Sequence, residues 1–209
     1  VEKPIDSYMP ALRNTEWAGT RVIGVLDMAS GMDIIENQAG RENPRSVITR
    51  YNLAASGEKN ADGKKENLFE LIRSAKRSGP PGTAFDYSSI NTTLLALLAE
   101  AVENKRWSDI YQERVWSKMT VEGDLQVSIA PDSTPLPHGL VASRLRDMAR
   151  YGMLYTPSWH KAARERIVSQ AYVRQIQAGG RKEIFLKGEI GNHLTTAFFP
   201  ASPPSANHW

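Results

Sequence analysis

Hydroxyl and phenol side chains gather in residues 79–98, which read Gly-Pro-Pro-Gly-Thr-Ala-Phe-Asp-Tyr-Ser-Ser-Ile-Asn-Thr-Thr-Leu-Leu-Ala-Leu-Leu. The prolines have a fixed φ and cannot continue a helix, and the glycines permit tight turns. The segment from Phe85 to Ser89 is therefore delivered to a fixed place just before an apolar helix. Loops held on a rigid scaffold often carry catalytic groups. An ordinary helix entry gives the same local pattern, so both interpretations stay open at this point.

Two Ser-x-x-Lys matches also occur, and a lysine one helical turn after a serine can remove the proton of the serine hydroxyl. Ser56 and Lys59 lie in a polar, glycine-containing loop. Ser158 and Lys161 follow Pro157 at an expected helix start, but no apolar residues surround them that would desolvate the lysine. We interpret both matches as coincidental and not as catalytic pairs.

Other familiar sites find no support in the sequence. It contains no glycine-rich phosphate loop, no His-Glu-x-x-His and no Gly-x-Ser-x-Gly elbow. The absence of cysteine excludes disulfides, thiolate metal sites and a cysteine nucleophile. The histidines lie far apart and show no metal-ligand spacing: His138, His160, His193 and His208. We therefore expect no metal site and no cofactor.

The composition is that of a globular protein. The chain has 209 residues, of which 41% are hydrophobic and 23% are charged, which is enough for a real core. No apolar run approaches the roughly 18 residues of a membrane span, so no transmembrane segment is expected. The formal charge of +3 is modest. Basic residues are expected on solvated helix faces and not in a nucleic-acid-binding stripe: Lys64-Lys65, Lys76-Arg77, and Arg144, Arg146 and Arg150.

Apolar residues recur at helical spacing, so we expect a mostly helical chain. The i, i+3, i+4, i+7 rule predicts helices over residues 22–29, 66–77, from the end of the 79–98 stretch to about Val102, 110–119, 144–156 and 160–177. Side-chain caps are expected from Thr20, Ser108, Ser143 and Asn91 at helix starts, and a C-terminal stop from Gly31. The helix after Ser143 is expected to turn these residues to the core: Leu145, Met148, Ala149, Gly152 and Met153.

The remaining segments are expected to be extended or irregular. Residues 1–19 are predicted to form an extended packed arm, and residues 33–63 a polar surface excursion with little regular structure. Alternating apolar residues predict a short strand over residues 124–130. Residues 183–186 and 194–199 also have the character of strands.

Four segments, in order, resemble the serine hydrolases related to class C β-lactamases. That group includes family VIII carboxylesterases, 6-aminohexanoate-dimer hydrolases and D-alanyl-D-alanine peptidases. The matching segments cover roughly residues 4–155: Ile5 to Pro10 (a Tyr-x-Pro arm), Val25 to Met32 (a leucine and serine-glycine helix), Pro81-Gly82-Thr83 with Phe85, Tyr87-Ser88 and Asn91 before Leu94-Leu95 (the second motif region), and His138-Gly139-Leu140 followed by Arg146 to Gly152. The resemblance implies a mainly α fragment of an α/β (α+β) β-lactamase/D,D-peptidase-like fold, a helical lobe with a few short strands.

The resemblance also implies roles for two residues. Members use a Ser-x-x-Lys motif, a Tyr-x-Asn motif and a Lys-Thr-Gly-like or His-x-Gly-like strand, and Tyr87 resembles the tyrosine of the second motif. Neighbouring lysine cations would favour its phenolate, which could then take the proton of the serine and return one to the leaving group. Ser89 stands at the third position in place of Asn. It is expected to contact substrate with one hydroxyl, a variant that fits esterase- or amidase-like members better than dedicated β-lactamases.

The other two motifs are expected outside the sequence. The Ser-x-x-Lys motif is expected before Val1, and the third motif beyond Trp209. Lys187-Gly188 is not accepted as the third motif, because it lacks a hydroxyl residue between the lysine and the glycine. Residues 1–209 are therefore expected to be an internal piece, a partial domain that is inactive alone. The parent protein would cleave a small-molecule ester or amide through an acyl-enzyme, without a cofactor. Oligomeric state is not predicted, and only family habit favours a periplasmic or cell-envelope location.

Two other functions stay open. The first is a catalytically dead relative that serves as a binding or sensor module, an alternative motivated by Ser89 in place of Asn. The second is an unrelated helical interaction domain, which would form a self-contained bundle. Helices with an uncovered apolar flank would instead indicate a partial domain.

Overall fold

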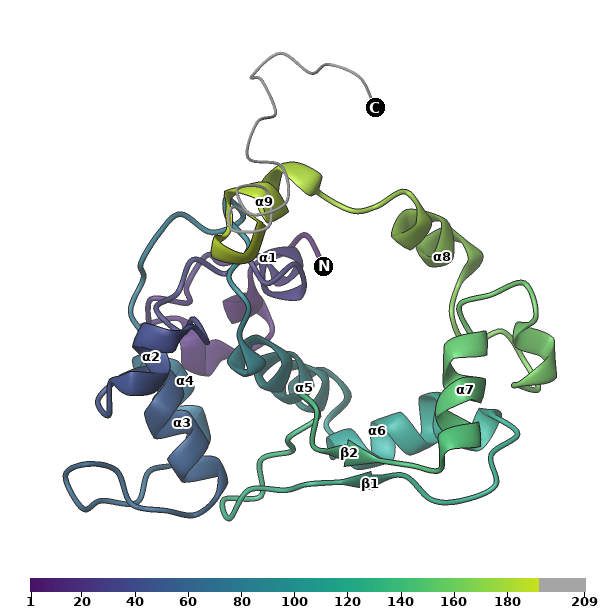
Figure 1. The fold of residues 1–209 in the computed structure, drawn as a ribbon, viewed down its shortest axis with the longest axis horizontal. Coiled ribbons are helices and arrows are strands. Elements are labelled where there is room, and N and C mark those ends of the chain that lie inside the picture. The colour runs from purple at the N-terminus through teal and green to yellow at the C-terminus, as the bar shows by residue number, and fades with distance from the viewer. Residues whose placement is uncertain (192–209) are drawn as a thin grey trace.

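The computed structural model describes residues 1–191, in which helices dominate and the strands are short (Figure 1). The predicted mainly helical chain with few strands is confirmed. The elements in chain order are the 3₁₀ turns η1 (Ile5–Ser7) and η2 (Pro10–Leu12), α1 (Val22–Leu26), α2 (Gln38–Glu42), α3 (Val47–Ala55), α4 (Leu68–Ser74), α5 (Ser89–Glu103), α6 (Trp107–Arg114), η3 (Trp116–Lys118), β1 (Gln126–Val127), β2 (Val141–Ala142), α7 (Leu145–Met153), η4 (Trp159–Lys161), α8 (Gln170–Gln177) and α9 (Lys182–Lys187).

The first core lies among the N-terminal turns and helices α1 to α5, on the left of Figure 1. Ile5, Trp17, Ile72 and Leu94 are fully buried in it. The indole Nε1 of Trp17 donates a hydrogen bond of 2.7 Å to the carbonyl oxygen of Ile72. This bond satisfies a buried polar atom and fixes the N-terminal segment to α4.

The second core lies between η3, α7 and η4, on the right of Figure 1. Trp116, Met119 and Leu154 are its largest buried side chains. Helix α5 packs against α1 at one end and against α6 at the other, so it links the two cores. Of the predicted strand over residues 124–130, the structure contains β1, which pairs antiparallel with β2.

The segment over residues 33–63 is better ordered than predicted, because it contains α2 and α3. The side chain of Asn37 caps α2 by accepting from the N–H of Gly40, and Ser46 caps α3 by accepting from the N–H of Thr49. The buried face of α3 is short: Ile48, Tyr51 and Ala54. Only a few buried positions carry this pattern, and the surrounding polar residues hid it in the sequence.

The expected helix caps are wrong at four positions. Helices α1, α6 and α7 start after Arg21, Arg106 and Arg144, whose side chains make no capping hydrogen bond. The expected caps therefore lie elsewhere: Thr20 before the start of α1, Ser108 inside α6, Ser143 before the start of α7, and Asn91 inside α5. A serine or threonine caps a helix only where the backbone turns at that residue, and local sequence leaves this open within one or two residues.

Gly31 does not end a helix, because α1 stops at Leu26. Its φ of +69° is left-handed, and a Cβ at this position would lie 2.3 Å from the carbonyl oxygen of Gly79. The N–H groups of Ser78 and Gly79 both donate to the carbonyl oxygen of Gly31. Glycine is therefore required here by the close approach of two backbone segments.

Of the residues of α7 predicted to face the core, Met153 packs against the second core, but Leu145 and Met148 do not become buried. Asp147 is fully buried, whereas Leu145 is 81% exposed and Met148 is 57% exposed. The carboxylate of Asp147 accepts hydrogen bonds from the N–H groups of Glu122 and Gly123. It also pairs with Arg150 at 2.6 Å, so that arginine is not on a solvated face as expected.

Several C-terminal and N-terminal predictions change as well. The predicted helix over residues 160–177 is only α8 preceded by η4, and residues 183–186 lie in helix α9 and not in a strand. Residues 194–199 lie outside the described part of the chain. The expected N-terminal arm contains the turns η1 and η2. Helix α9 lies beside α1, where Arg181 pairs with Asp27 (Figure 1).

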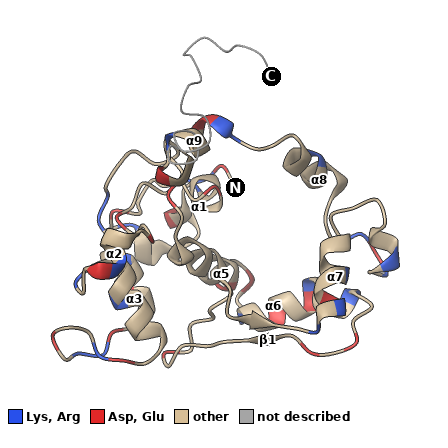
Figure 2. Cartoon of the chain, in the orientation of Figure 1, with Lys and Arg blue, Asp and Glu red and all other residues tan. Residues whose placement is uncertain are grey.

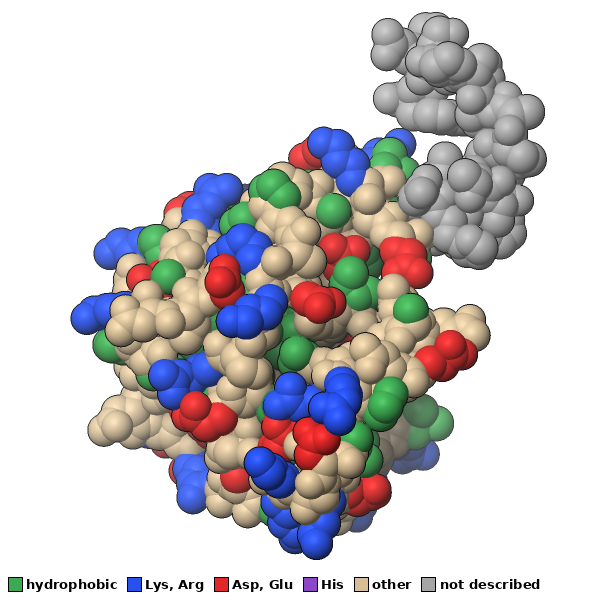
Figure 3. Space-filling model, turned by 90° about the vertical axis from the view of Figure 1, so that its left-hand side faces the viewer, with side chains coloured by type: hydrophobic (Ala, Val, Ile, Leu, Met, Phe, Trp, Pro, Cys, Tyr) green, Lys and Arg blue, Asp and Glu red, His purple; other side chains and the backbone are tan. Residues whose placement is uncertain are grey.

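Charges of both signs are interspersed along the helices (Figure 2) and over the face in Figure 3. On that face, basic side chains alternate with acidic and apolar ones and form no continuous stripe. Among residues 1–191, no helix combines the length and apolar character needed to cross a membrane.

Candidate active site

Tyr87 lies on a backbone segment that is bound on both sides. The N–H of Asp86 donates to the carbonyl oxygen of Met28 at 2.7 Å, and the carbonyl oxygen of Tyr87 accepts from the N–H of Glu36 at 3.1 Å. Upstream, the N–H of Gly82 donates to the carbonyl oxygen of Ala29 at 2.7 Å. The rigid presentation expected from the glycines and prolines is therefore achieved by pairing with residues 28–36.

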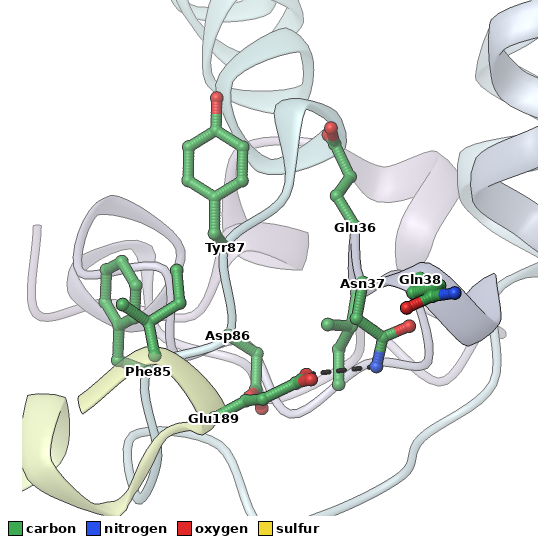
Figure 4. Close-up of a pocket in the computed structure, with 9 residues that line it drawn as sticks. Glu36, Asn37, Gln38, Phe85, Asp86, Tyr87 and Glu189 are labelled. Atoms are coloured by element: carbon green, nitrogen blue, oxygen red, sulfur yellow. Dashed lines mark hydrogen bonds between the residues drawn. The ribbon is translucent and has the colours of Figure 1, made fainter. Parts of the chain in front are cut away.

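The phenol of Tyr87 lines a cavity of about 380 Å³ and is itself 42% exposed. Figure 4 shows its side chain beside that of Glu36, both pointing in the same direction, with Asp86 and Glu189 at the other end of the group. The cavity is lined by Ile35, Glu36, Asn37, Gln38, Phe85, Asp86, Tyr87, Glu189 and Ile190. Tyr87 is thus presented to a solvent-accessible space and is not packed into the core.

The ionisable groups of this wall are acidic. Burial, and next the charge of Glu189, raise the pKa of Asp86 above its ordinary value. Glu189 in turn accepts a hydrogen bond of 3.0 Å from Nδ2 of Asn37 (Figure 4). The cavity wall formed by the described residues contains no lysine, so the cations expected beside Tyr87 are not supplied by this wall.

Ser89 is the first residue of α5 and is 7% exposed. Its N–H donates to the carboxylate Oε1 of Glu36. The preceding Ser88 is the N-cap, and its hydroxyl accepts from the N–H of Ile90 at 3.3 Å. The structure therefore places Tyr87 and Ser89 on one short segment, with Glu36 bonded to the backbone of both.

Asn91 does not cap α5, because it is the third residue of the helix and the cap position is taken by Ser88; its side chain is fully buried. Its Nδ2 lies 3.6 Å from the sulfur of Met28. Its Oδ1 is buried without a hydrogen-bond partner among residues 1–191. The side chain thus packs against the segment that supports Tyr87.

A buried polar group that sequence reasoning missed lies behind the site. The hydroxyl oxygens of Tyr51 and Thr93 lie 2.6 Å apart, and burial raises the pKa of Tyr51 to about 12. The imidazole of His138 packs on Tyr51 with ring centroids 5.7 Å apart, and burial lowers its pKa.

Sequence reasoning also missed Glu36, because it lies in the segment predicted to be irregular. The only local signal was Asn37, the cap of α2, beside it.

Neither Ser-x-x-Lys match forms a site in the described part of the chain. Ser56 ends α3 and Ser158 precedes η4, and no side-chain hydrogen bond joins Ser56 to Lys59 or Ser158 to Lys161 within residues 1–191. No group of His, Asp or Glu side chains in that part is arranged to hold a metal ion.

Comparison with curated proteins finds hydrolases. The chain is 28% identical over 181 residues to 6-aminohexanoate-dimer hydrolase of Paenarthrobacter ureafaciens, an alignment that covers 87% of this chain and 45% of the relative. It is 27% identical over 81 residues to an unguisins hydrolase of Aspergillus campestris, covering 37% of this chain and 15% of the relative. The chain therefore spans less than half the length of the curated relatives it matches.

Solved structures share the fold. A protein assigned as a 6-aminohexanoate-dimer hydrolase from Bacillus anthracis superposes with a TM-score of 0.70 at 22% identity, over 88% of this chain and 47% of that one. A protein assigned as a β-lactamase from Bacteroides dorei gives 0.58 at 17% identity, over 98% and 55%. The fold is thus a mainly helical part of a β-lactamase-like fold. The family model for beta-lactamase matches residues 1–186, and the chain belongs to that family.

Proposed function

We propose that this chain is part of a serine hydrolase that cleaves a small-molecule ester or amide through an acyl-enzyme, with Tyr87 as its proton carrier. The observation that carries the proposal is the position of Tyr87. In sequence it resembles the tyrosine of the second motif; in the structure its backbone is bound on both sides, and its phenol is open to a cavity. The membership of the chain in a family whose matched relatives are named as hydrolases supports this function.

In the proposed reaction Tyr87 acts in two proton transfers, one from the serine and one to the leaving group. The phenolate of Tyr87 takes the hydroxyl proton of a serine as that oxygen attacks the carbonyl carbon of the substrate. The tetrahedral intermediate collapses, the bond to the leaving group breaks, and the phenol returns its proton to the departing oxygen or nitrogen. Water then attacks the acyl-enzyme and releases the acid and the free serine. Ser89, two residues on, is proposed to contact the substrate.

We further propose that the nucleophilic serine and its lysine belong to a part of the protein outside this sequence. The chain is then a partial domain over residues 1–209 that does not turn over substrate alone. Three observations support this: the short coverage of the relatives, the lack of a side-chain hydrogen bond within either Ser-x-x-Lys match in residues 1–191, and the apolar side chains left exposed on the described helices. The last group includes Leu145, Met148, Ile176 and Leu186.

The test is Tyr87→Phe in the full-length protein that contains this sequence. We expect kcat to fall by about 100-fold or more, because a positioned proton carrier contributes about 10²–10⁴. Tyr172→Phe is the control, since Tyr172 is 51% exposed on α8 and away from the cavity. The intact protein should react with a serine-directed fluorophosphonate, whereas the 209-residue chain should not. Unchanged kcat in Tyr87→Phe, or labelling of the chain alone, would contradict the proposal.

A binding or sensor module without turnover is the alternative. It is motivated by Ser89 at the position where the motif has Asn, and by the low exposure of Ser89. This alternative predicts saturable binding of an ester or amide to the full-length protein, with no fluorophosphonate labelling. A full-length sequence that lacks Ser-x-x-Lys would favour it.

A further inference from the structure

We propose that Glu36 is a positioning residue that holds Tyr87 in its working orientation by hydrogen bonds to the carbonyl oxygen of Tyr87 and to the N–H of Ser89. This inference rests on the proposed function, in which Tyr87 carries the proton. It concerns a residue 51 positions upstream in a segment where the sequence indicated no role.

Glu36 makes two hydrogen bonds to the backbone around Tyr87, and we call this pair of bonds the clamp. The backbone N–H of Glu36 donates to the carbonyl oxygen of Tyr87 at 3.1 Å. Its carboxylate Oε1 accepts from the N–H of Ser89, two residues further along. The two bonds thus hold the backbone directly after the Tyr87 side chain, from its own carbonyl oxygen to the N–H of the first residue of α5. Figure 4 shows the side chains of Glu36 and Tyr87 next to each other at the cavity.

The carboxylate of Glu36 accepts from an N–H group at the start of α5 that has no partner within the helix. The first N–H groups of a helix have no partner within the helix, and the Ser89 N–H is one of them. The N-cap Ser88 accepts from Ile90 and not from Ser89. A carboxylate at a helix N-terminus makes a charge-assisted hydrogen bond and is favoured by the helix dipole. Glu36 therefore contributes, together with the N-cap Ser88, to fixing the first turn of α5 and the position of the preceding Tyr87.

The position of Glu36 is itself well defined. Its side chain is only 11% exposed, and the next residue, Asn37, caps α2. Arg41 approaches the second carboxylate oxygen at 3.6 Å, but the arginine side chain is 63% exposed, so this ion pair contributes little. Tyr51 and His138 lie near enough for the charge of Glu36 to act on both. The acceptor for Ser89 is thus held in place before any substrate binds.

Loss of the clamp has a specific consequence for catalysis. Without the acceptor, the first turn of α5 gains freedom, and the phenol of Tyr87 moves relative to the serine that it must deprotonate. A misplacement of about 1 Å can cost on the order of 100-fold in rate. Binding of the substrate by other residues changes much less, so we expect the effect in kcat and not in KM.

The experiment compares two conservative variants in the full-length protein. Glu36→Gln keeps an acceptor oxygen at the same reach, and we expect kcat within about 2-fold of wild type. Glu36→Asp keeps the charge but withdraws the acceptor by one methylene, and we expect kcat to fall by about 10-fold with KM within about 2-fold. The matched control is Glu42→Asp at the exposed end of α2, where, within residues 1–191, the side chain accepts only from Gln38.

A double-mutant cycle with Tyr87→Phe separates positioning from general damage. If Glu36 acts through the tyrosine, Glu36→Asp should cause no further loss of kcat in the Tyr87→Phe background. An equal loss in both backgrounds, or an inactive Glu36→Gln, would overturn the inference while leaving the role of Tyr87 intact. A Tyr87→Phe variant with unchanged kcat would instead refute the proposed function.

Discussion

At the scale of single residues, the environment of a side chain decides its role more than its type does. Tyr87 and Tyr51 are both tyrosines near the start of α5, but their surroundings differ. Tyr87 is 42% exposed at a cavity, whereas Tyr51 is fully buried and burial raises its pKa to about 12. The hydroxyl of Tyr51 faces Thr93 inside the core, whereas the phenol of Tyr87 opens to the cavity, so Tyr87 is the one of the two that a substrate can reach in the proposed reaction.

Asp147 gives a prediction about pH at this scale. Its burial alone would raise its pKa, but hydrogen bonds from the Glu122 N–H and from Arg150, with the charge of that arginine, lower the pKa overall. Because the pKa of Asp147 is lower in the folded state, its ionised carboxylate stabilises the fold. This contribution is present in full at pH values above the ordinary pKa of about 3.9. That stabilisation is lost as the pH falls through the lowered value. We expect Asp147→Asn to reduce the free energy of unfolding at neutral pH.

Urea unfolding of the full-length protein from about pH 6 to about pH 2 tests this. The loss of stability below about pH 4 should be smaller in Asp147→Asn than in wild type. Asp62→Asn is the control, because Asp62 pairs with Arg45 while its side chain is 51% exposed. An unchanged acid dependence in Asp147→Asn would show that this carboxylate does not titrate as described.

At the scale of elements, the site depends on two segments that lie side by side. Residues 28–36 receive hydrogen bonds from Gly82 and Asp86 and, through Glu36, bind the start of α5. Gly31 brings the same segment against the turn at Gly79. The turn before α5 therefore owes its position to its pairing partner as much as to its own prolines.

Gly31→Ala tests this close approach. The added Cβ would lie 2.3 Å from the carbonyl oxygen of Gly79, and the φ of +69° is strained for alanine. We expect a loss of about 2–4 kcal/mol in the free energy of unfolding, from strain and forced separation of the two segments. Gly63→Ala is the matched control, since its φ is +76° with no atom within 4 Å of the new Cβ. It should cost only about 1 kcal/mol. Equal losses would contradict the clash.

At the scale of the whole molecule, two cores are linked by α5, and some helices leave apolar residues uncovered. Helix α7 shows both features, a packed core at its end and uncovered apolar residues along its length. Leu154, the C-cap residue of α7, lies in the second core, whereas Leu145 and Met148 on the helix are largely exposed. The family match rules out an unrelated helical domain, and the exposed apolar residues fit the proposal of a partial domain.

Alanine substitutions on α7 distinguish its two faces. In the 209-residue chain, Leu154→Ala should destabilise by about 2–5 kcal/mol, because Leu154 is 1% exposed in a packed core. Leu145→Ala should change stability by no more than about 0.5 kcal/mol, because Leu145 is 81% exposed. Chemical denaturation of both variants is the measurement. A larger loss from Leu145→Ala would mean that the buried face is the one predicted from the sequence pattern.

The sequence by itself determined the features that depend on local chemistry. The mainly helical character, the rigid turn at residues 79–86, the long apolar helix after it and the family resemblance around Tyr87 were all predictable. Each rests on neighbours within a few residues: prolines and glycines fix the turn, and a dense apolar run specifies α5.

Only the tertiary structure decided the rest, because the contacts concerned join residues far apart in the chain. The bond from Ser89 to Glu36 spans 53 positions, and no local pattern marks that glutamate as its acceptor. The buried face of α7 is set by a loop that offers N–H groups to Asp147, which overrides the apolar periodicity of the helix. A hydrogen bond between distant segments needs the whole fold to bring donor and acceptor together, so it is visible only there.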